Sequence, residues 1–307
     1  MNPVNLSTQF AGITLRNPLI TCSGTYGFGE EYTSYCPLEA LGGITLKGVT
    51  PLPRLGNPVP RLAETPAGLL NAVGLENPGL DEFIQSYLPK IRKLPTAAIA
   101  NISGFSLEDY VQLARALQKD SGLAALEVNI SCPNVKHGGM HFGTDPQSAQ
   151  EVIAAVKAET DLPVIAKLSP NVTDIVGMAR AVQLGGADAI SLINTLLGMH
   201  IDIYQQRPVL ANTFGGLSGP AIRPVAVRMV WQVFQAVDLP IIGMGGITTW
   251  QDAVEFMLAG ATAISIGTGN FVNPQAPLEI LQGIKEYCEE RGLASVRDLV
   301  GLAHHVR

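Results

Sequence analysis

The stretch IIGMGGITTWQDAVEFMLAGATAISIGTG, residues 241–269, contains two short apolar runs separated by a segment whose apolar residues follow helical spacing. The runs IIGMGG (241–246) and AISIGTG (263–269) have the length of strands, and TWQDAVEFMLAGA (249–261) is long enough for a helix. A strand, a crossover helix and a second strand form a unit whose two strands run parallel. This stretch therefore predicts a parallel sheet covered by helices.

The same alternation recurs along the chain of 307 residues. Eight parallel strands with nearly continuous apolar sequences fit a (β/α)8 TIM barrel better than an open doubly wound sheet. We therefore predict a single α/β domain over residues 1–307, with extended loops at the C-terminal face of the strands. The further strand-like runs are LITCSG (19–24), GITLKGV (43–49), AAIANIS (97–103), ALEVNIS (125–131), VIAKLS (164–169) and AISLINT (189–195). The further helical patterns cover residues 106–122, 145–160, 172–186 and 277–292.

Two connections, 49–97 and 195–241, are too long to be one helix each, and both are rich in Pro, Gly and Asn. In a compact domain, segments of this kind are more often functional loops than spacers. Both begin at the strand end where barrel enzymes build their active sites. We expect both connections to contribute to a site.

The composition excludes several classes of protein. A hydrophobic fraction of 47% with 15% charged residues indicates a globular chain with a sizeable core. A net charge of −6 disfavours a nucleic-acid groove as the main surface. The N-terminus has no signal-peptide pattern and no run of about 18 apolar residues occurs, so we expect a cytoplasmic protein away from the membrane. The four cysteines form no CxxC pair, which predicts reduced thiols and no metal.

Polar or glycine residues stand at the C-terminal end of every strand-like run. Any one of them is most simply a helix cap or a solvent-exposed strand end. Together, two lysines and three asparagines at one barrel mouth suit a planar, anionic ligand that carries amide groups. The turns GMGG (243–246) and IGTG (266–269) follow the last two strands, where barrels commonly bind phosphate, although glycines also serve as plain turn residues. These positions predict a mononucleotide-sized ligand at the mouth.

Cys132, in VNISCPNVKHGG (128–139), has four conceivable roles: metal ligand, nucleophile, proton-transfer group or bystander. No second cysteine or histidine cluster lies nearby in sequence, which disfavours a metal. A buried inert thiol is the usual fate of cysteine, but Cys132 follows a strand end and precedes a proline. With an ordinary pKa of about 8.5, a thiol beside lysines is a suitable proton acceptor near neutral pH. A reactive role therefore stays open beside the inert one.

Several longer stretches resemble the soluble, class 1 dihydroorotate dehydrogenases, and the resemblance runs nearly end to end. The loop NVKHGGMHFGTDP (134–146) is most similar to the class 1B subclass, which passes electrons to NAD. The membrane-associated class has an N-terminal extension and a serine where this chain has Cys132. The stretches that carry the resemblance include GTYGFGEEY (24–32), TLKGVTPLPRLGNPVPRLAETPAGLLNAVGLENPG (45–79), VNISCPNVKHGGMHFGTDP (128–146), GGLSGPAIRP (215–224) and ISIGTGNF (264–271).

The resemblance implies an enzyme of pyrimidine biosynthesis that oxidises dihydroorotate and holds one FMN per chain. It implies that Cys132 is the base that takes the C5 proton, and that the Pro133–Gly143 loop closes over the substrate. The implied FMN contacts are Ser23, Lys47, Gly48, Asn101, Asn129, Lys167, Ile193, Gly219, Gly245, Gly246, Gly267 and Thr268. The implied substrate contacts are Lys47, Asn71, Ala72, Val73, Gly74, Leu75, Asn129, Asn194 and Thr195.

The resemblance also implies a partner subunit that carries FAD and a 2Fe–2S cluster, bound to a homodimer of this chain in a heterotetramer. Four other functions are considered beside it. The first is a fumarate-using class 1A-like enzyme. The others are a barrel like inosine-monophosphate dehydrogenase with a covalent thiol, a tRNA-modifying flavin reductase, and a flavin-binding module without activity. The position of Cys132 after the fourth strand disfavours the barrel like inosine-monophosphate dehydrogenase, and the negative net charge disfavours the tRNA-modifying flavin reductase.

Overall fold

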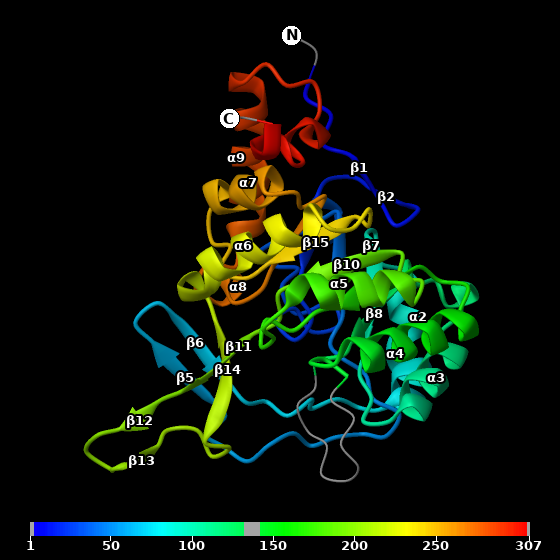
Figure 1. Cartoon of the computed structure of the whole chain (residues 1–307), viewed down its shortest axis with the longest axis vertical. Coiled ribbons are helices and arrows are strands. Elements are labelled where there is room, and N and C mark those ends of the chain that lie inside the picture. Colours follow the sequence, from blue (N-terminus) through cyan, green and yellow to red (C-terminus); the bar gives the residue numbers. More distant parts are fainter. Residues whose placement is uncertain (1–2, 132–141, 306–307) are drawn as a thin grey trace.

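Eight parallel strands close into a barrel in a computed structural model that describes residues 3–131 and 142–305 (Figure 1). Neighbours around the barrel follow chain order, so each strand pairs with the next along the sequence. The predicted TIM barrel and all eight of its strands are confirmed. The strands are β3 (Leu19–Thr21), β4 (Gly43–Thr45), β7 (Ala97–Ile102), β8 (Ala125–Asn129), β9 (Val164–Lys167), β10 (Ala189–Leu192), β15 (Ile241–Met244) and β16 (Ala263–Ile266).

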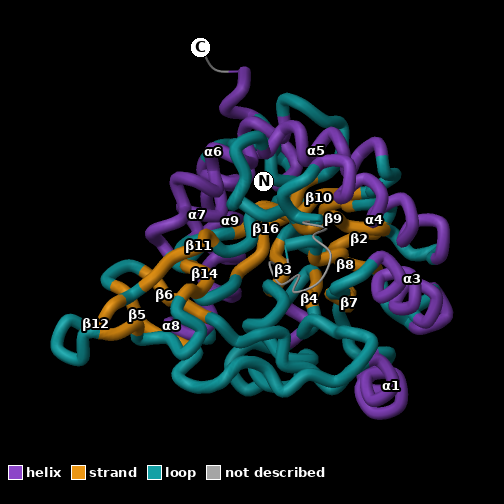
Figure 2. The backbone as a smooth tube through the Cα atoms, turned by 60° about the horizontal axis from the view of Figure 1, so that its bottom comes forward, coloured by secondary structure: helices purple, strands orange, loops and turns teal. Residues whose placement is uncertain are grey.

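Helices surround the strands on the outside of the barrel (Figure 2). Two of them begin at capping boxes: the side chains of Ser106 and Thr249 accept from the backbone N–H three residues later, and the aspartate there returns the bond. The five predicted helices are confirmed with shorter bounds, and the chain adds α6. The helices are α3 (Leu107–Ala116), α4 (Pro146–Glu159), α5 (Ile175–Leu184), α6 (Arg223–Phe234), α7 (Trp250–Leu258) and α9 (Ala276–Glu290), with short α1 (Leu80–Glu82), α2 (Leu88–Ile91) and α8 (Gly269–Val272).

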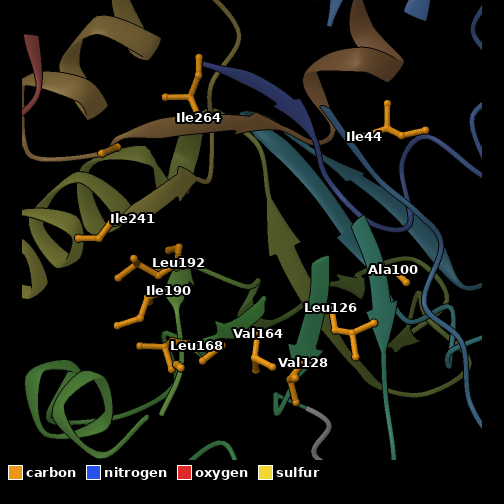
Figure 3. Packing of buried hydrophobic residues seen from close by; sticks show 14 of the residues in the cluster. Ile44, Ala100, Leu126, Val128, Val164, Leu168, Ile190, Leu192, Ile241 and Ile264 are labelled. Carbon is orange, nitrogen blue, oxygen red and sulfur yellow. The ribbon is translucent and has the colours of Figure 1, made fainter. Parts of the chain in front are cut away.

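Alternate residues of each strand face the helices or the barrel interior. Outward-facing side chains such as Leu126, Val128 and Ile190 belong to the main core between strands and helices (Figure 3). Inward-facing residues, among them Ile99 and Ile165, form a second cluster inside the barrel together with Phe10 and Leu15. These last two come from the N-terminal hairpin, β1 (Thr8–Phe10) and β2 (Ile13–Leu15). The hairpin therefore fills the N-terminal end of the barrel and leaves the C-terminal rim for a site.

The two long connections meet in one antiparallel sheet beside the barrel rim, with strand order β11-β14-β6-β5. In this sheet Gly216 of the second connection is paired with Asn71 of the first. A further hairpin, β12 (Ile201–Asp202) and β13 (Arg207–Pro208), extends away from the barrel (Figure 1). The strands of the sheet are β5 (Leu62–Thr65), β6 (Gly68–Asn71), β11 (Leu196–Met199) and β14 (Phe214–Ser218).

None of the helices within residues 3–131 and 142–305 has the length and apolar character needed to cross a membrane.

Candidate active site

The side chains expected to bind a ligand lie on a single rim, because the C-terminal ends of all eight parallel strands point the same way. Asn101 lies near the end of β7, and Asn129 and Lys167 are the last residues of β8 and β9. The other predicted contacts follow strands directly: Ser23 after β3, Lys47 and Gly48 after β4, Asn71–Leu75 at the end of β6 and beyond it, Ile193–Thr195 after β10, Gly219 after β14, Gly245 and Gly246 after β15, Gly267 and Thr268 after β16.

A buried network of charged and polar groups lies inside the barrel below this rim. The carboxylate of Glu127 accepts hydrogen bonds from Asn101 Nδ2 at 2.7 Å and from Ser191 Oγ at 2.8 Å. The ammonium of Lys167 lies 3.3 Å from the same carboxylate and donates to Ser23 Oγ at 3.1 Å. Glu127 and Lys167 are only 1% and 5% exposed, so water screens their attraction weakly. The network joins four strands and the segment that follows β3, and it holds the Lys167 ammonium in place.

Glu127 was missed by sequence reasoning, although the sequence carried a signal for it. In ALEVN (125–129) every second residue faces the interior, so Glu127 shares a face with Ala125 and with Asn129. A charged residue within an otherwise apolar, buried strand needs a partner of opposite charge. Lys167 is that partner, and the pairing of Asn129 with Lys167 in neighbouring strands places it within reach. Ser191 was missed as well.

Asn129 is held by contacts from three sides. Its Nδ2 donates to Ser103 Oγ at 3.2 Å, and its Oδ1 accepts from Asn194 Nδ2 at 3.3 Å. The hydroxyl of Tyr110 donates to its backbone carbonyl at 2.9 Å. Asn129 and Asn194 were both predicted to bind substrate, and the structure brings their amides into contact. Paired amides at a rim present both donors and acceptors to a planar ligand.

The long connections place the remaining substrate candidates beside the rim. Asn71 Nδ2 donates to the backbone carbonyl of Gly216 at 3.2 Å, and a side chain at Gly216 would collide with Thr195. Asn71 and Thr195 therefore both contact β14. The loop after Asn71 is held by the first connection itself, since Asn57 N donates to the Val73 carbonyl at 2.9 Å. The tertiary pairing of β6 with β14 thus assembles this part of the site.

The glycines after β15 lie close to the backbone of Gly219, in the region where a phosphate was predicted to bind. Gly245 and Gly246 have φ angles of 122° and 81°, in the left-handed region that favours glycine. A Cβ at Gly246 would lie 2.8 Å from the carbonyl oxygen of Gly219 and 2.8 Å from Arg223 Cβ. The end of β15 therefore lies against the residue after β14. Exposed backbone N–H groups in such turns suit a phosphate.

Lys47 and the thiols of Cys132 and Cys22 are the remaining candidates for a role in the site. Lys47 is half-buried and its ammonium makes no hydrogen bond or ion pair with the residues that the structure describes, so it is available to an anion. Cys132 and residues 133–141, which include most of the predicted closing loop, lie outside the described residues. Cys22 lies below the rim, where Ser265 Oγ is 3.1 Å from its sulfur, and burial raises the pKa of this thiol. Cys22 is therefore unsuited to act as a base.

The rim fits a flavin mononucleotide. The Lys167 ammonium and the amides of Asn101 and Asn129 are groups of the kind that bind the heteroatom edge of a flavin ring, and the left-handed glycines after β15 are of the kind that bind a terminal phosphate. Gly48 is required for space, since a Cβ there would lie 2.8 Å from Asn101 Oδ1. The rim thus contains donors of the types that this cofactor needs.

A family model and the three relatives given below all indicate the same enzyme family. A family model described as dihydroorotate dehydrogenase matches residues 5–288. The chain is 57% identical to the "Dihydroorotate dehydrogenase B (NAD(+)), catalytic subunit" of Desulforamulus reducens, over 98% of this chain and 99% of the relative. It is 56% identical to the protein of the same description from Geotalea uraniireducens, with the same coverage. A third relative of that description, from Trichlorobacter lovleyi, is 55% identical over 96% of this chain and 97% of its own length.

Proposed function

The chain belongs to the dihydroorotate dehydrogenase family, and from this membership we propose that it oxidises dihydroorotate to orotate in the de novo synthesis of UMP. The observation that carries the proposal is the barrel rim, where two lysines and three asparagines lie together with the left-handed glycines Gly245 and Gly246. The near full-length similarity to catalytic subunits supports the same reaction. Within this proposal, residues 1–307 form one FMN-binding TIM-barrel domain.

One FMN per chain would be bound at the rim, and when bound it accepts the hydride that leaves C6 of the substrate. Lys167 would face the edge of the ring where reduction builds negative charge, since its ammonium is the buried cation of the network. Asn101 and Asn129 would bind the polar ring edge. The phosphate would accept hydrogen bonds from backbone N–H groups of the glycine turns. The remaining contacts are Ser23, Lys47, Gly48, Ile193, Gly219, Gly245, Gly246, Gly267 and Thr268.

Dihydroorotate would lie against the flavin, with its carboxylate on the ammonium of the half-buried Lys47. The amides of Asn71, Asn129 and Asn194 supply donors and acceptors that match the imide and amide edges of the ring. Thr195 and the backbone of residues 72–75 would line the rest of the substrate. This arrangement orients the C5–C6 bond before any bond changes.

Cys132 is proposed as the general base. C5 of dihydroorotate lies next to a carbonyl group, so its hydrogen leaves as a proton, which the thiolate takes. Loss of this proton together with the C6 hydride converts the C5–C6 single bond into a double bond. No covalent bond to sulfur is needed. The Pro133–Gly143 loop that contains the neighbouring residues would exclude water from the site.

Anaerobic addition of dihydroorotate to the purified protein tests this function. We expect the flavin absorbance to bleach, because electrons pass from the substrate to the cofactor. Dihydrouracil, which has the same ring without the carboxylate, is the matched control, and we expect little bleaching because Lys47 has no carboxylate to bind. A yellow protein that dihydroorotate leaves yellow would show a flavin-binding module without this activity.

We further propose that electrons leave through a second subunit that carries FAD and a 2Fe–2S cluster and passes them to NAD. The relatives from Desulforamulus reducens and Geotalea uraniireducens are NAD-linked catalytic subunits by name, which supports this route. The assembly would be a heterotetramer around a homodimer of this chain. The cytoplasm is the proposed compartment, where the free thiols of Cys22, Cys36 and Cys288 stay reduced.

Co-purification from the native source tests the partner. We expect a second, flavin- and iron-containing chain to elute with this one, and the complex to reduce NAD with dihydroorotate. The isolated chain, assayed with fumarate as acceptor, is the control and should turn over slowly. An isolated homodimer with strong fumarate reduction and no partner would place the chain in the other soluble subclass.

A further inference from the structure

Glu127 is a buried carboxylate beside the cation that the proposed function assigns to the flavin. Glu127 is 1% exposed. Its oxygens accept hydrogen bonds from Asn101 Nδ2 at 2.7 Å and from Ser191 Oγ at 2.8 Å, and the Lys167 ammonium lies 3.3 Å away. These partners come from β7, β10 and β9, so the carboxylate is held from three neighbouring directions. A negative charge fixed this firmly has an electrostatic effect on whatever lies above Lys167.

The sign of that effect follows from elementary electrostatics. An ammonium near a flavin stabilises the negative charge that reduction places on the ring, and so raises the reduction potential. A carboxylate 3.3 Å from the ammonium cancels much of that field, because the pair acts at a distance as a dipole. Lys167 still donates its hydrogen bonds, but the electrostatic field that it exerts on the flavin is weaker.

Resting on the proposed function, we propose that Glu127 is a positioning residue that offsets the charge of Lys167 and thereby keeps the reduction potential of bound FMN low. Glu127 does not touch the substrate; it acts through the lysine. The ammonium is held between Glu127 of β8 and the segment after β3, where Ser23 accepts its second hydrogen bond at 3.1 Å. A low potential favours onward transfer of electrons to an acceptor of low potential such as NAD. Lys167 can therefore hold the flavin through its hydrogen bonds without raising the reduction potential by the full effect of its charge.

The test is the reduction potential of the FMN-loaded Glu127→Gln variant, measured by dye-equilibrated reduction without dihydroorotate. Glutamine has the same shape without the charge. We expect the ratio of reduced to oxidised FMN at a given solution potential to rise about tenfold, which is about 30 mV for a two-electron couple. The conservative Glu127→Asp variant retains the charge and should restore most of the wild-type potential.

Asp188→Asn is the matched control. Asp188 immediately precedes β10, at the opposite end of the barrel, and its carboxylate accepts from Lys157 Nζ at 2.5 Å and from Val164 N at 2.7 Å. The variant thus removes a carboxylate from a lysine pair far from the rim, and we expect the wild-type potential. An equal rise in Asp188→Asn, or an unchanged potential in Glu127→Gln, overturns the proposal.

A second variant keeps the test open if Glu127→Gln does not fold. Glu127→Asp is this variant, because it keeps a buried charge beside Lys167. Its side chain is one methylene shorter, which draws the carboxylate away from the ammonium that lies 3.3 Å from it in the wild type, so we expect a rise in the same direction but well below tenfold in the ratio. If the potential of Glu127→Asp does not rise at all, the proposal is overturned. Because no measurement here uses dihydroorotate, failure of this inference is distinguishable from failure of the bleaching experiment.

Discussion

The Cys132→Ala variant should bind FMN like the wild type and lose steady-state turnover. General-base catalysis contributes about 10²–10⁴-fold to a rate, and alanine offers no group to take the C5 proton. The measurement is the initial rate of orotate formation at saturating dihydroorotate, with the flavin content determined on the same sample. Full activity in Cys132→Ala would contradict the assignment of the base.

Two further variants show whether the loss comes from proton transfer. Cys132→Ser retains a hydroxyl that is far less acidic than a thiol, so we expect a trace of activity whose pH profile moves to alkaline values. Cys288→Ala is the matched control, because Cys288 is a buried thiol of α9 on the outside of the barrel. Its rate and pH profile should be those of the wild type. A serine variant with an unchanged pH profile would argue for a structural role of Cys132.

The Lys167→Ala variant should retain FMN poorly and reduce it slowly. The substitution removes the buried cation, and it leaves the Glu127 carboxylate, 1% exposed, without its partner at 3.3 Å. Breaking a buried ion pair by removing one member costs about 3–5 kcal/mol, so the free energy of unfolding should fall as well. The measurements are FMN content after gel filtration, the single-turnover rate of flavin reduction, and the midpoint of chemical denaturation.

Lys157→Ala is the matched control for Lys167→Ala. Lys157 pairs with Asp188 at 2.5 Å, but both side chains are about one third exposed, so water screens their attraction. Pairs of this kind contribute about 0–1 kcal/mol, and we expect FMN retention and reduction to stay unchanged. An unaltered flavin spectrum and single-turnover rate in Lys167→Ala would rule out its proposed role at the flavin.

Much of the fold was predictable because its determinants are local in sequence. A buried parallel strand needs only four or five consecutive apolar residues, and the capping boxes at Ser106 and Thr249 occupy four residues each. The strand-end positions of Asn129 and Lys167 followed from the same runs, since every barrel strand points its C-terminal end to one rim. The resemblance added roles for these residues. The role of Cys132, outside the described residues, stays a prediction.

The amino-acid sequence by itself thus determined the barrel and the set of polar residues at its mouth, through hydrophobic periodicity and helix caps. Only the tertiary structure decided which of these residues meet. Asn71 and Gly216 are 145 positions apart, and Glu127 is 64 positions from Ser191, so their contacts exist only once the barrel has closed. A single strand pattern specifies which face a side chain takes, whereas its partners depend on the register of the neighbouring strands. For that reason the charge pair beneath the rim was missed, although both of its members stood in strands that had been recognised.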